Sequence, residues 1–114
     1  MLSQGLPAAQ LKADLFKSLG HPLRVQVLEQ LAVGESSVGS LAEALGCELS
    51  NLSQQLGVLR RAGVVVTRRE GNTIYYALRD TGTVELLAAA KRMLLSNLTD
   101  SHALLRTMEQ DSPQ

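Results

Sequence analysis

The chain has 114 residues, 45% of them hydrophobic, and its 11 basic and 11 acidic side chains give a net charge of zero. Such a length fits one domain, 1–114, and an even balance of charge argues against a protein that coats nucleic acid without regard to sequence. One cysteine excludes an internal disulfide, no stretch is long enough to cross a membrane, and no secretory signal is visible from Met1 to Leu11, so we expect a soluble cytoplasmic protein.

Residues 8–34 carry the pattern of two N-terminal helices. Leucines recur every four residues in the first helix, which Gly20 ends. Pro22 suits the first position of the next helix, because its missing N–H has no partner to lose there. His21, directly before it, is a residue type that binds metals, but we expect it to cap the second helix, which ends at Gly34.

Residues 38–63 hold two further apolar-periodic segments, separated by a break at Gly46. Gly46 can take the left-handed conformation that closes the first segment, and Glu48 or Ser50 can cap the second. Two helices joined by so short a turn are typical of a helix-turn-helix. Cys47, in the turn, is expected to be a small buried hydrophobe, and a redox role is the alternative.

The second helix of this pair has an aliphatic side and a polar side. Leu52, Leu56 and Leu59 fall together at about 100° per residue. Amides and hydroxyls on the other side can bond base edges in a major groove, and arginines can neutralise phosphates. An ordinary solvated face is the alternative, because such residues are common on protein surfaces. The candidates for DNA contact on this helix are Ser50, Asn51, Ser53, Gln54, Gln55, Arg60 and Arg61.

Residues 64–79 contain two β-branched runs around a turn with Gly71 and Asn72 at its tip, which predicts a β-hairpin. A hairpin directly after the second helix is a wing. Residues 50–79 carry five arginines against one acid, a local charge of about +4, which is the electrostatic footprint of DNA binding. Arginines that keep an edge strand soluble are the alternative. The candidates for DNA contact in the hairpin are Arg68, Arg69, Asn72 and Tyr75.

Residues 83–109 are expected to form one or two C-terminal dimerisation helices. The segment is apolar nearly all round as far as Leu98, and a helix so apolar on a small chain must be covered from more than one side. A second copy about a two-fold axis is the simplest cover. The core helix of a monomer is the alternative, but little chain remains to wrap it. Thr99 or Asp100 is expected to cap a final helix.

These elements predict a mainly α fold with about five helices and a two-stranded wing, a winged helix-turn-helix. The chain from about Phe16 to Asp80 also resembles the ArsR/SmtB family of bacterial winged-helix repressors. The resemblance is carried by ordered blocks, LGHPLRVQVL from residue 19, LAEALG from 41, LSQQL from 52, LRRAGVV from 59 and REGNTIYYAL from 69. It implies a homodimer that binds operator DNA through the second helix and the wing and is released by an effector.

The resemblance also implies two metal sites, and neither is complete in this sequence. Ser37 and Gly39 stand where metal-sensing relatives have cysteines, and they cannot replace soft thiolates. The second family site keeps one carboxylate, Asp80, because its other positions hold Gly82, Met93 and Ser96. Asp100 with His102 could hold nickel, cobalt or zinc as an effector if a second copy adds ligands, and a pair of surface residues is the alternative.

Enzyme chemistry has little support, because the sequence has two histidines, no glycine-rich phosphate loop and no nucleophile elbow. We therefore predict a sequence-specific DNA-binding transcriptional regulator, a homodimeric repressor with a transition metal as a candidate effector. The alternatives are a winged-helix module that binds proteins, and a regulator that senses redox state, a small ligand or a co-regulator protein. A protein-binding module is expected to expose an apolar patch on the second helix, and Val58 alone interrupts its polar side.

Overall fold

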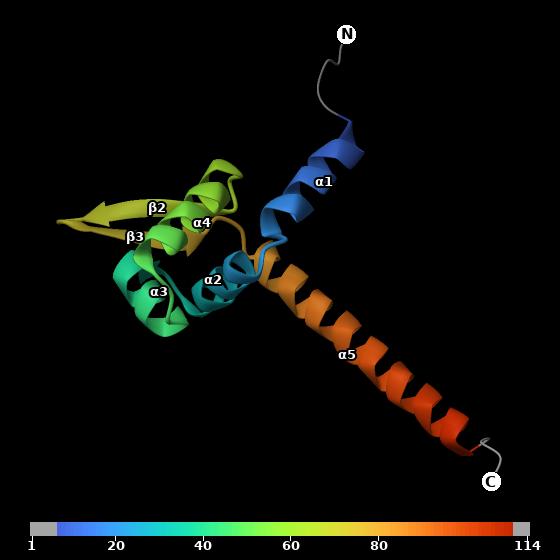
Figure 1. Cartoon of the computed structure of the whole chain (residues 1–114). Coiled ribbons are helices and arrows are strands. Elements are labelled where there is room, and N and C mark those ends of the chain that lie inside the picture. The colour runs from blue at the N-terminus through green and yellow to red at the C-terminus, as the bar shows by residue number, and fades with distance from the viewer. Residues whose placement is uncertain (1–6, 111–114) are drawn as a thin grey trace. The chain divides into compact units, whose positions relative to one another are not determined.

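The structure, a computed structural model, describes residues 7–110. Residues 1–6 and 111–114, which include the start of the segment searched for a secretory signal, lie outside that range. The chain divides into two compact units, Met1–Thr83 and Val84–Gln114, and α5 (Gly82–Gln110) provides the described part of the second. Figure 1 labels the elements of the first unit, which are α1 (Ala8–Leu19), α2 (Pro22–Val33), β1 (Ser36–Ser37), α3 (Val38–Leu45), α4 (Leu49–Arg61), β2 (Val65–Glu70) and β3 (Thr73–Leu78).

The core of the first unit lies between α2, α3, α4 and the start of the hairpin, which Figure 1 shows packed side by side. The leucine stripe predicted for α4 is confirmed, because all three of its leucines are buried there. Truncating a leucine so buried costs about 2–5 kcal/mol, so this stripe anchors α4 on the rest of the unit. The most deeply buried side chains are Val27, Leu28, Leu41, Leu52, Leu56, Leu59 and Val65.

The ends of the helices follow local capping chemistry. His21 caps α2 as predicted, since its Nδ1 accepts a hydrogen bond from the backbone N–H of Leu23 at 3.1 Å. Gly46 ends α3 in the left-handed conformation, at φ 61° and ψ 37°, which is also as predicted. Glu48 holds the capping position of α4, but its side chain makes no capping hydrogen bond.

The sheet has three antiparallel strands in the order β1-β3-β2, where the sequence predicted two. The hairpin of β2 and β3 is the predicted wing, and the pair Glu70–Thr73 closes it around a left-handed Gly71. The added strand is β1, which pairs with Tyr75 and Tyr76 of β3. Two serines carry no strand pattern of their own, so the strand exists because β3 offers an open edge to pair with.

The helix α5 runs unbroken for 29 residues, so the prediction of a separate final helix is wrong. The hydroxyl of Thr99 does not cap a new helix but donates to the carbonyl of Leu95, one turn earlier, at 2.9 Å. None of the residues of α5, all of which the structure describes, is buried within the chain. Within residues 7–110, no helix combines the length and the apolar character needed to cross a membrane.

Candidate nucleic-acid interface

The exposed side of α4 carries most of the residues predicted to contact DNA. Leu52, Leu56 and Leu59 hold the opposite side of the helix against the core, so its polar side is turned to solvent. The predicted residues that are exposed on α4 are Ser50, Asn51, Ser53, Gln54, Arg60 and Arg61. In a helix-turn-helix the N-terminal part of the second helix reaches the base edges, and here that part presents two hydroxyls and two amides.

Gln55 does not lie on this side, and the prediction that it faces outward is wrong. Its side chain is 7% exposed, and its Oε1 accepts a hydrogen bond from Nη1 of Arg24 at 2.8 Å. The burial of Gln55 could have been predicted from the sequence, because Gln55 stands three residues from Leu52 and four from Leu59, at the border of the buried stripe. Its partner Arg24, on α2, was not predicted as part of the site.

The wing carries a second cluster, centred on Arg68. Its guanidinium is bonded to the carboxylates of Glu35 and Glu70, and it lies 4.6 Å from the ring centroid of Tyr75. The hydrogen bond from Arg68 lowers the pKa of Glu35 below its usual value, and the same bond is the main cause of a raised pKa of Arg68. Glu35 lies outside residues 50–79, whose local net charge is about +4, and including it lowers that charge to about +3.

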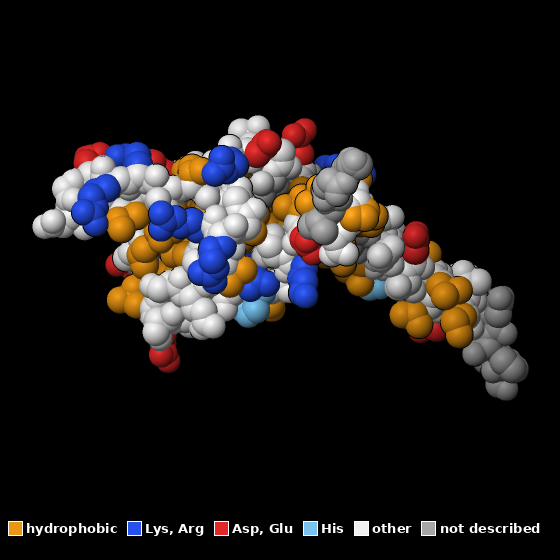
Figure 2. Space-filling model, turned by 90° about the horizontal axis from the view of Figure 1, so that it is seen from above, with side chains coloured by type: hydrophobic (Ala, Val, Ile, Leu, Met, Phe, Trp, Pro, Cys, Tyr) orange, Lys and Arg blue, Asp and Glu red, His pale blue; other side chains and the backbone are white. Residues whose placement is uncertain are grey.

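The other predicted wing residues differ in their exposure. Arg69 is exposed on β2, and Asn72 is exposed at the tip of the hairpin. Tyr75 is half-buried beneath Arg68, so these two predicted residues contact each other. In Figure 2, lysine and arginine side chains extend from the hairpin across the neighbouring helices of the first unit. The predicted basic surface is therefore present, with one of its arginines held by acids.

Comparison with known proteins gives the family. A family model described as a helix-turn-helix domain matches residues 19–68. The HTH-type transcriptional regulator Rv0081 of Mycobacterium tuberculosis is 48% identical over 103 residues, which cover 90% of each chain. The chain belongs to the ArsR/SmtB family. The biofilm growth-associated repressor of Agrobacterium fabrum is 46% identical over 88 residues, covering 74% of this chain and 75% of the repressor.

Solved structures agree with this assignment. The crystal structure of Rv0081 superposes with a TM-score of 0.77 at 49% identity, over 85% of this chain and 98% of that one. The transcriptional repressor BigR from Xylella fastidiosa gives a TM-score of 0.70 at 41% identity, over 75% and 87%. The chain is accordingly a DNA-binding transcriptional regulator of the winged helix-turn-helix type and not an enzyme.

The metal positions of this ArsR/SmtB chain hold residues that are poor metal ligands, and one of them, Ser37, has another role. The hydroxyl of Ser37 caps α3 by accepting from the backbone N–H of Ser40 at 3.1 Å, and the neighbouring Gly39 brings no side chain. Cys47, which is not one of these positions, was expected to be buried but is only half-buried in the turn before α4. The other family positions hold Gly82, in the first turn of α5, and Met93 and Ser96, which are exposed on that helix.

Asp100 and His102 are both exposed on α5. Two helical positions turn about 200°, so the two side chains leave the helix on nearly opposite sides and one chain does not bring them to the same ion. Within residues 7–110, no three His, Cys, Asp or Glu side chains form a group that could hold a metal ion. A metal site on this helix therefore stays a prediction that depends on a second chain.

Proposed function

We propose that the chain is a homodimeric repressor that binds an operator with α4 in the major groove and the wing on the adjacent backbone. The observation that carries this proposal is the exposed first half of α4. Ser50, Asn51, Ser53 and Gln54 present hydrogen-bonding groups there, while Arg60 and Arg61 are exposed in the last turn of α4 and Arg69 is exposed on β2. Side-chain amides read base edges and so supply sequence specificity, whereas arginines neutralise phosphates and so supply affinity for any sequence.

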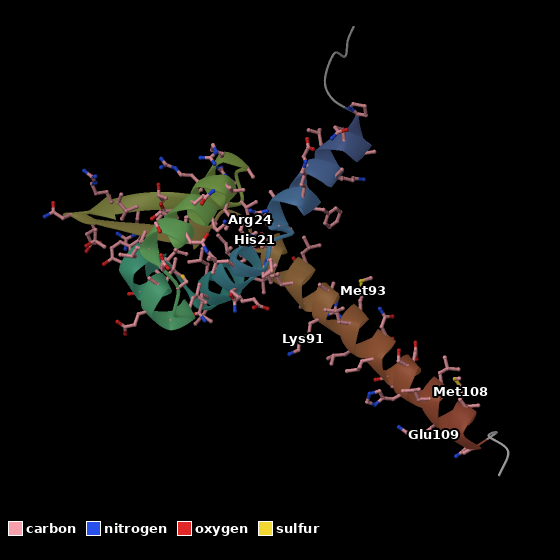
Figure 3. All side chains as sticks on the ribbon, in the orientation of Figure 1. His21, Arg24, Lys91, Met93, Met108 and Glu109 are labelled. Atoms are coloured by element: carbon pink, nitrogen blue, oxygen red, sulfur yellow. The ribbon has the colours of Figure 1, made fainter. Side chains whose placement is uncertain are left out.

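The dimer is proposed from apolar surface that the chain leaves uncovered. In α1, Leu11, Leu15 and Phe16 are 56%, 43% and 58% exposed. In α5, a second group of large apolar residues is exposed, and Figure 3 shows Met93 and Met108 projecting from that helix. Exposed apolar surface of this extent favours a second copy of the chain as its cover.

The action as a repressor is proposed from the relatives, which include proteins named as repressors in Agrobacterium and Xylella. Repression of operator DNA implies a cytoplasmic location. The effector is proposed in two forms. The first candidate effector is a transition metal bound by His102 and shared between two chains. The alternative is a redox signal, a small ligand or a co-regulator protein.

The proposal is tested by selecting bound sequences from a random DNA library with the purified protein, and then footprinting the selected operator. We expect protection of two half-sites about one turn of DNA apart, because two recognition helices related by a two-fold axis have that spacing. Gln54→Ala is expected to relax base preference at one position, by about 1–3 kcal/mol, while the fold stays intact. Arg69→Ala is expected to weaken binding to all sequences and to reduce the salt slope by about 0.9.

Gln26→Ala provides the matched control, since it removes an exposed amide from α2 rather than from α4. It is expected to bind as the wild type does. A protein that selects no sequence from the library would contradict operator binding and would favour the protein-interaction module instead.

A further inference from the structure

A half-buried arginine, Arg24, connects α1 to the DNA-reading helix. Arg24 donates from Nε to the carbonyl of Ser18 at 2.7 Å and from Nη2 to the carbonyl of Lys17 at 3.3 Å. These carbonyls belong to the last turn of α1, and that of Lys17 also accepts from the backbone N–H of Gly20, the C-cap residue, at 3.2 Å. The third bond runs from Nη1 to Oε1 of Gln55 on α4, at 2.8 Å. Figure 3 labels Arg24 beside His21, where α1 meets α2.

This contact fixes which way round the amide of Gln55 is held. A guanidinium carries donors only, so the atom of Gln55 that faces Arg24 must be the carbonyl oxygen. The Nε2 group then points the other way, and it donates to Oδ1 of Asn51 at 3.4 Å, a long hydrogen bond. Gln55 is only 7% exposed, so solvent offers it few alternative partners. Among the described residues, no buried side-chain nitrogen or oxygen lacks a partner.

The orientation of the Gln55 amide also fixes the orientation of the exposed amide of Asn51. Because Oδ1 of Asn51 accepts from Gln55, its Nδ2 group is the end turned away from the buried amide. Asn51 is exposed in the first turn of α4, the part of the helix that reaches base edges in a helix-turn-helix. The donor end of Asn51 is therefore the end available to a base.

We propose that Arg24 and Gln55 are positioning residues that hold Asn51 as a hydrogen-bond donor toward the operator. Asn51 then reads a base that presents an acceptor in the major groove, which purines offer at N7, guanine also at O6, and thymine at O4. Cytosine presents only its N4 donor there, so it is disfavoured at the base that Asn51 contacts. This inference rests on the proposed function, since it assigns a base preference to one residue of the same interface.

The hydrogen bonds from Arg24 to Gln55 and from Gln55 to Asn51 are here called the relay. Gln55→Glu tests the relay by reversing its polarity. A carboxylate can still accept from Arg24, but it has no donor for Asn51, so the amide of Asn51 must turn its Nδ2 inward and present Oδ1. We expect preference at one operator position to move toward cytosine or adenine, whose exocyclic amino groups donate. The change in the cytosine-to-guanine affinity ratio is expected to be about tenfold or more, the size of one good base contact.

The measurement is competitive binding to the selected operator and to all of its single-base variants. The matched comparison is Gln55→Glu in an Asn51→Ala background, where the substitution is expected to leave base preference unchanged. Gln55→Met removes both links with a side chain of similar length, so it is expected to flatten the preference without reversing it. This variant also tests the relay should Gln55→Glu fold poorly, which thermal unfolding would report.

The outcomes distinguish failure of the relay from failure of the proposed DNA interface. If Asn51→Ala alters base preference while Gln55→Glu and Gln55→Met retain the wild-type pattern, Asn51 reads DNA but the relay is wrong. A shift that appears equally in the Asn51→Ala background would also overturn the relay. If neither Asn51→Ala nor Gln54→Ala alters any base preference, the operator-reading role of α4 itself fails.

Discussion

Arg68, on β2, donates from Nε to both carboxylate oxygens of Glu35, at 3.1 and 3.0 Å, although the two residues stand 33 positions apart. The contact ties the wing to the segment that leads into β1. A further bond from Nη1 reaches Glu70 at 2.7 Å. The arginine that sequence reasoning assigned to DNA phosphates is thus already paired with two acids, and a phosphate has to compete with them.

Glu35→Gln is expected to strengthen DNA binding. The neutral amide cannot hold the charge of Arg68, so its Nε and Nη2 become available to a phosphate while Nη1 keeps its bond to Glu70. One more phosphate contact makes log K fall more steeply with log salt, by about 0.9. Fluorescence anisotropy with the selected operator between low and high salt measures both effects. Glu29→Gln, the same change at an exposed position of α2, is the control. Equal gains in the two variants would mean that net charge alone acts.

The Glu35–Arg68 pair also makes stability depend on pH. Hydrogen bonding from Arg68 holds the pKa of Glu35 below its ordinary value of 4.5, so the unfolded chain binds the proton more readily than the folded one. The stabilisation is complete above pH 4.5 and is lost as the pH falls through the lowered pKa. Thermal unfolding of the wild type and of Glu35→Gln is expected to differ at neutral pH and to converge as the pH falls below 4.5. A difference that stays constant with pH would exclude the ion pair as its source.

The sequence predicts best those features of the fold that depend on residues close together along the chain. The leucine stripe of α4, the left-handed glycine after α3 and the histidine cap of α2 each involve residues within a turn or two of one another. All three are confirmed by the structure. Helical periodicity and capping act over such short distances, so one sequence contains all the information that they need.

The features that the sequence missed depend on partners far along the chain. Strand β1 forms because Ser36 pairs with Tyr76, and the charge of Arg68 is offset by Glu35, which lies in another segment. Gln55 is a mixed case. Its position beside the buried leucines was visible, but its amide is satisfied there only because Arg24 of α2 approaches it. Neither spacing nor charge along the chain identifies such a partner.

His21→Ala is expected to lower the free energy of unfolding by about 1 kcal/mol, because the N–H of Leu23 loses its acceptor at the start of α2. His21→Asn keeps a capping acceptor and is expected to recover most of the loss. Urea unfolding followed by circular dichroism measures the three proteins under the same conditions. Equal loss in both variants would mean that His21 stabilises the fold by packing rather than by its hydrogen bond.

Leu94→Asp is expected to dissociate the dimer. Leu87, Leu94, Leu98, Leu105 and Met108 recur at steps of seven, four, seven and three residues, which places them along one side of α5. Leu94 is 69% exposed in the single chain, so a second copy is its expected cover. Ser96→Asp adds the same charge about 200° around the helix and is the control. Sedimentation of monomeric Leu94→Asp beside dimeric Ser96→Asp supports the stripe, and two unaltered dimers would reject it.

A metal effector at His102 is expected to need two chains, because Asp100 leaves α5 on nearly the opposite side and one chain supplies too few ligands. Calorimetric titration of the metal-free protein with nickel, cobalt and zinc tests this directly. Binding is expected to be lost in His102→Ala and in the dissociated Leu94→Asp protein, and to persist in Asp100→Ala. Undiminished stoichiometry in His102→Ala would exclude His102 as a ligand. If the wild type binds none of the three ions, the signal has to reach the dimer through redox chemistry, a small ligand or a partner protein.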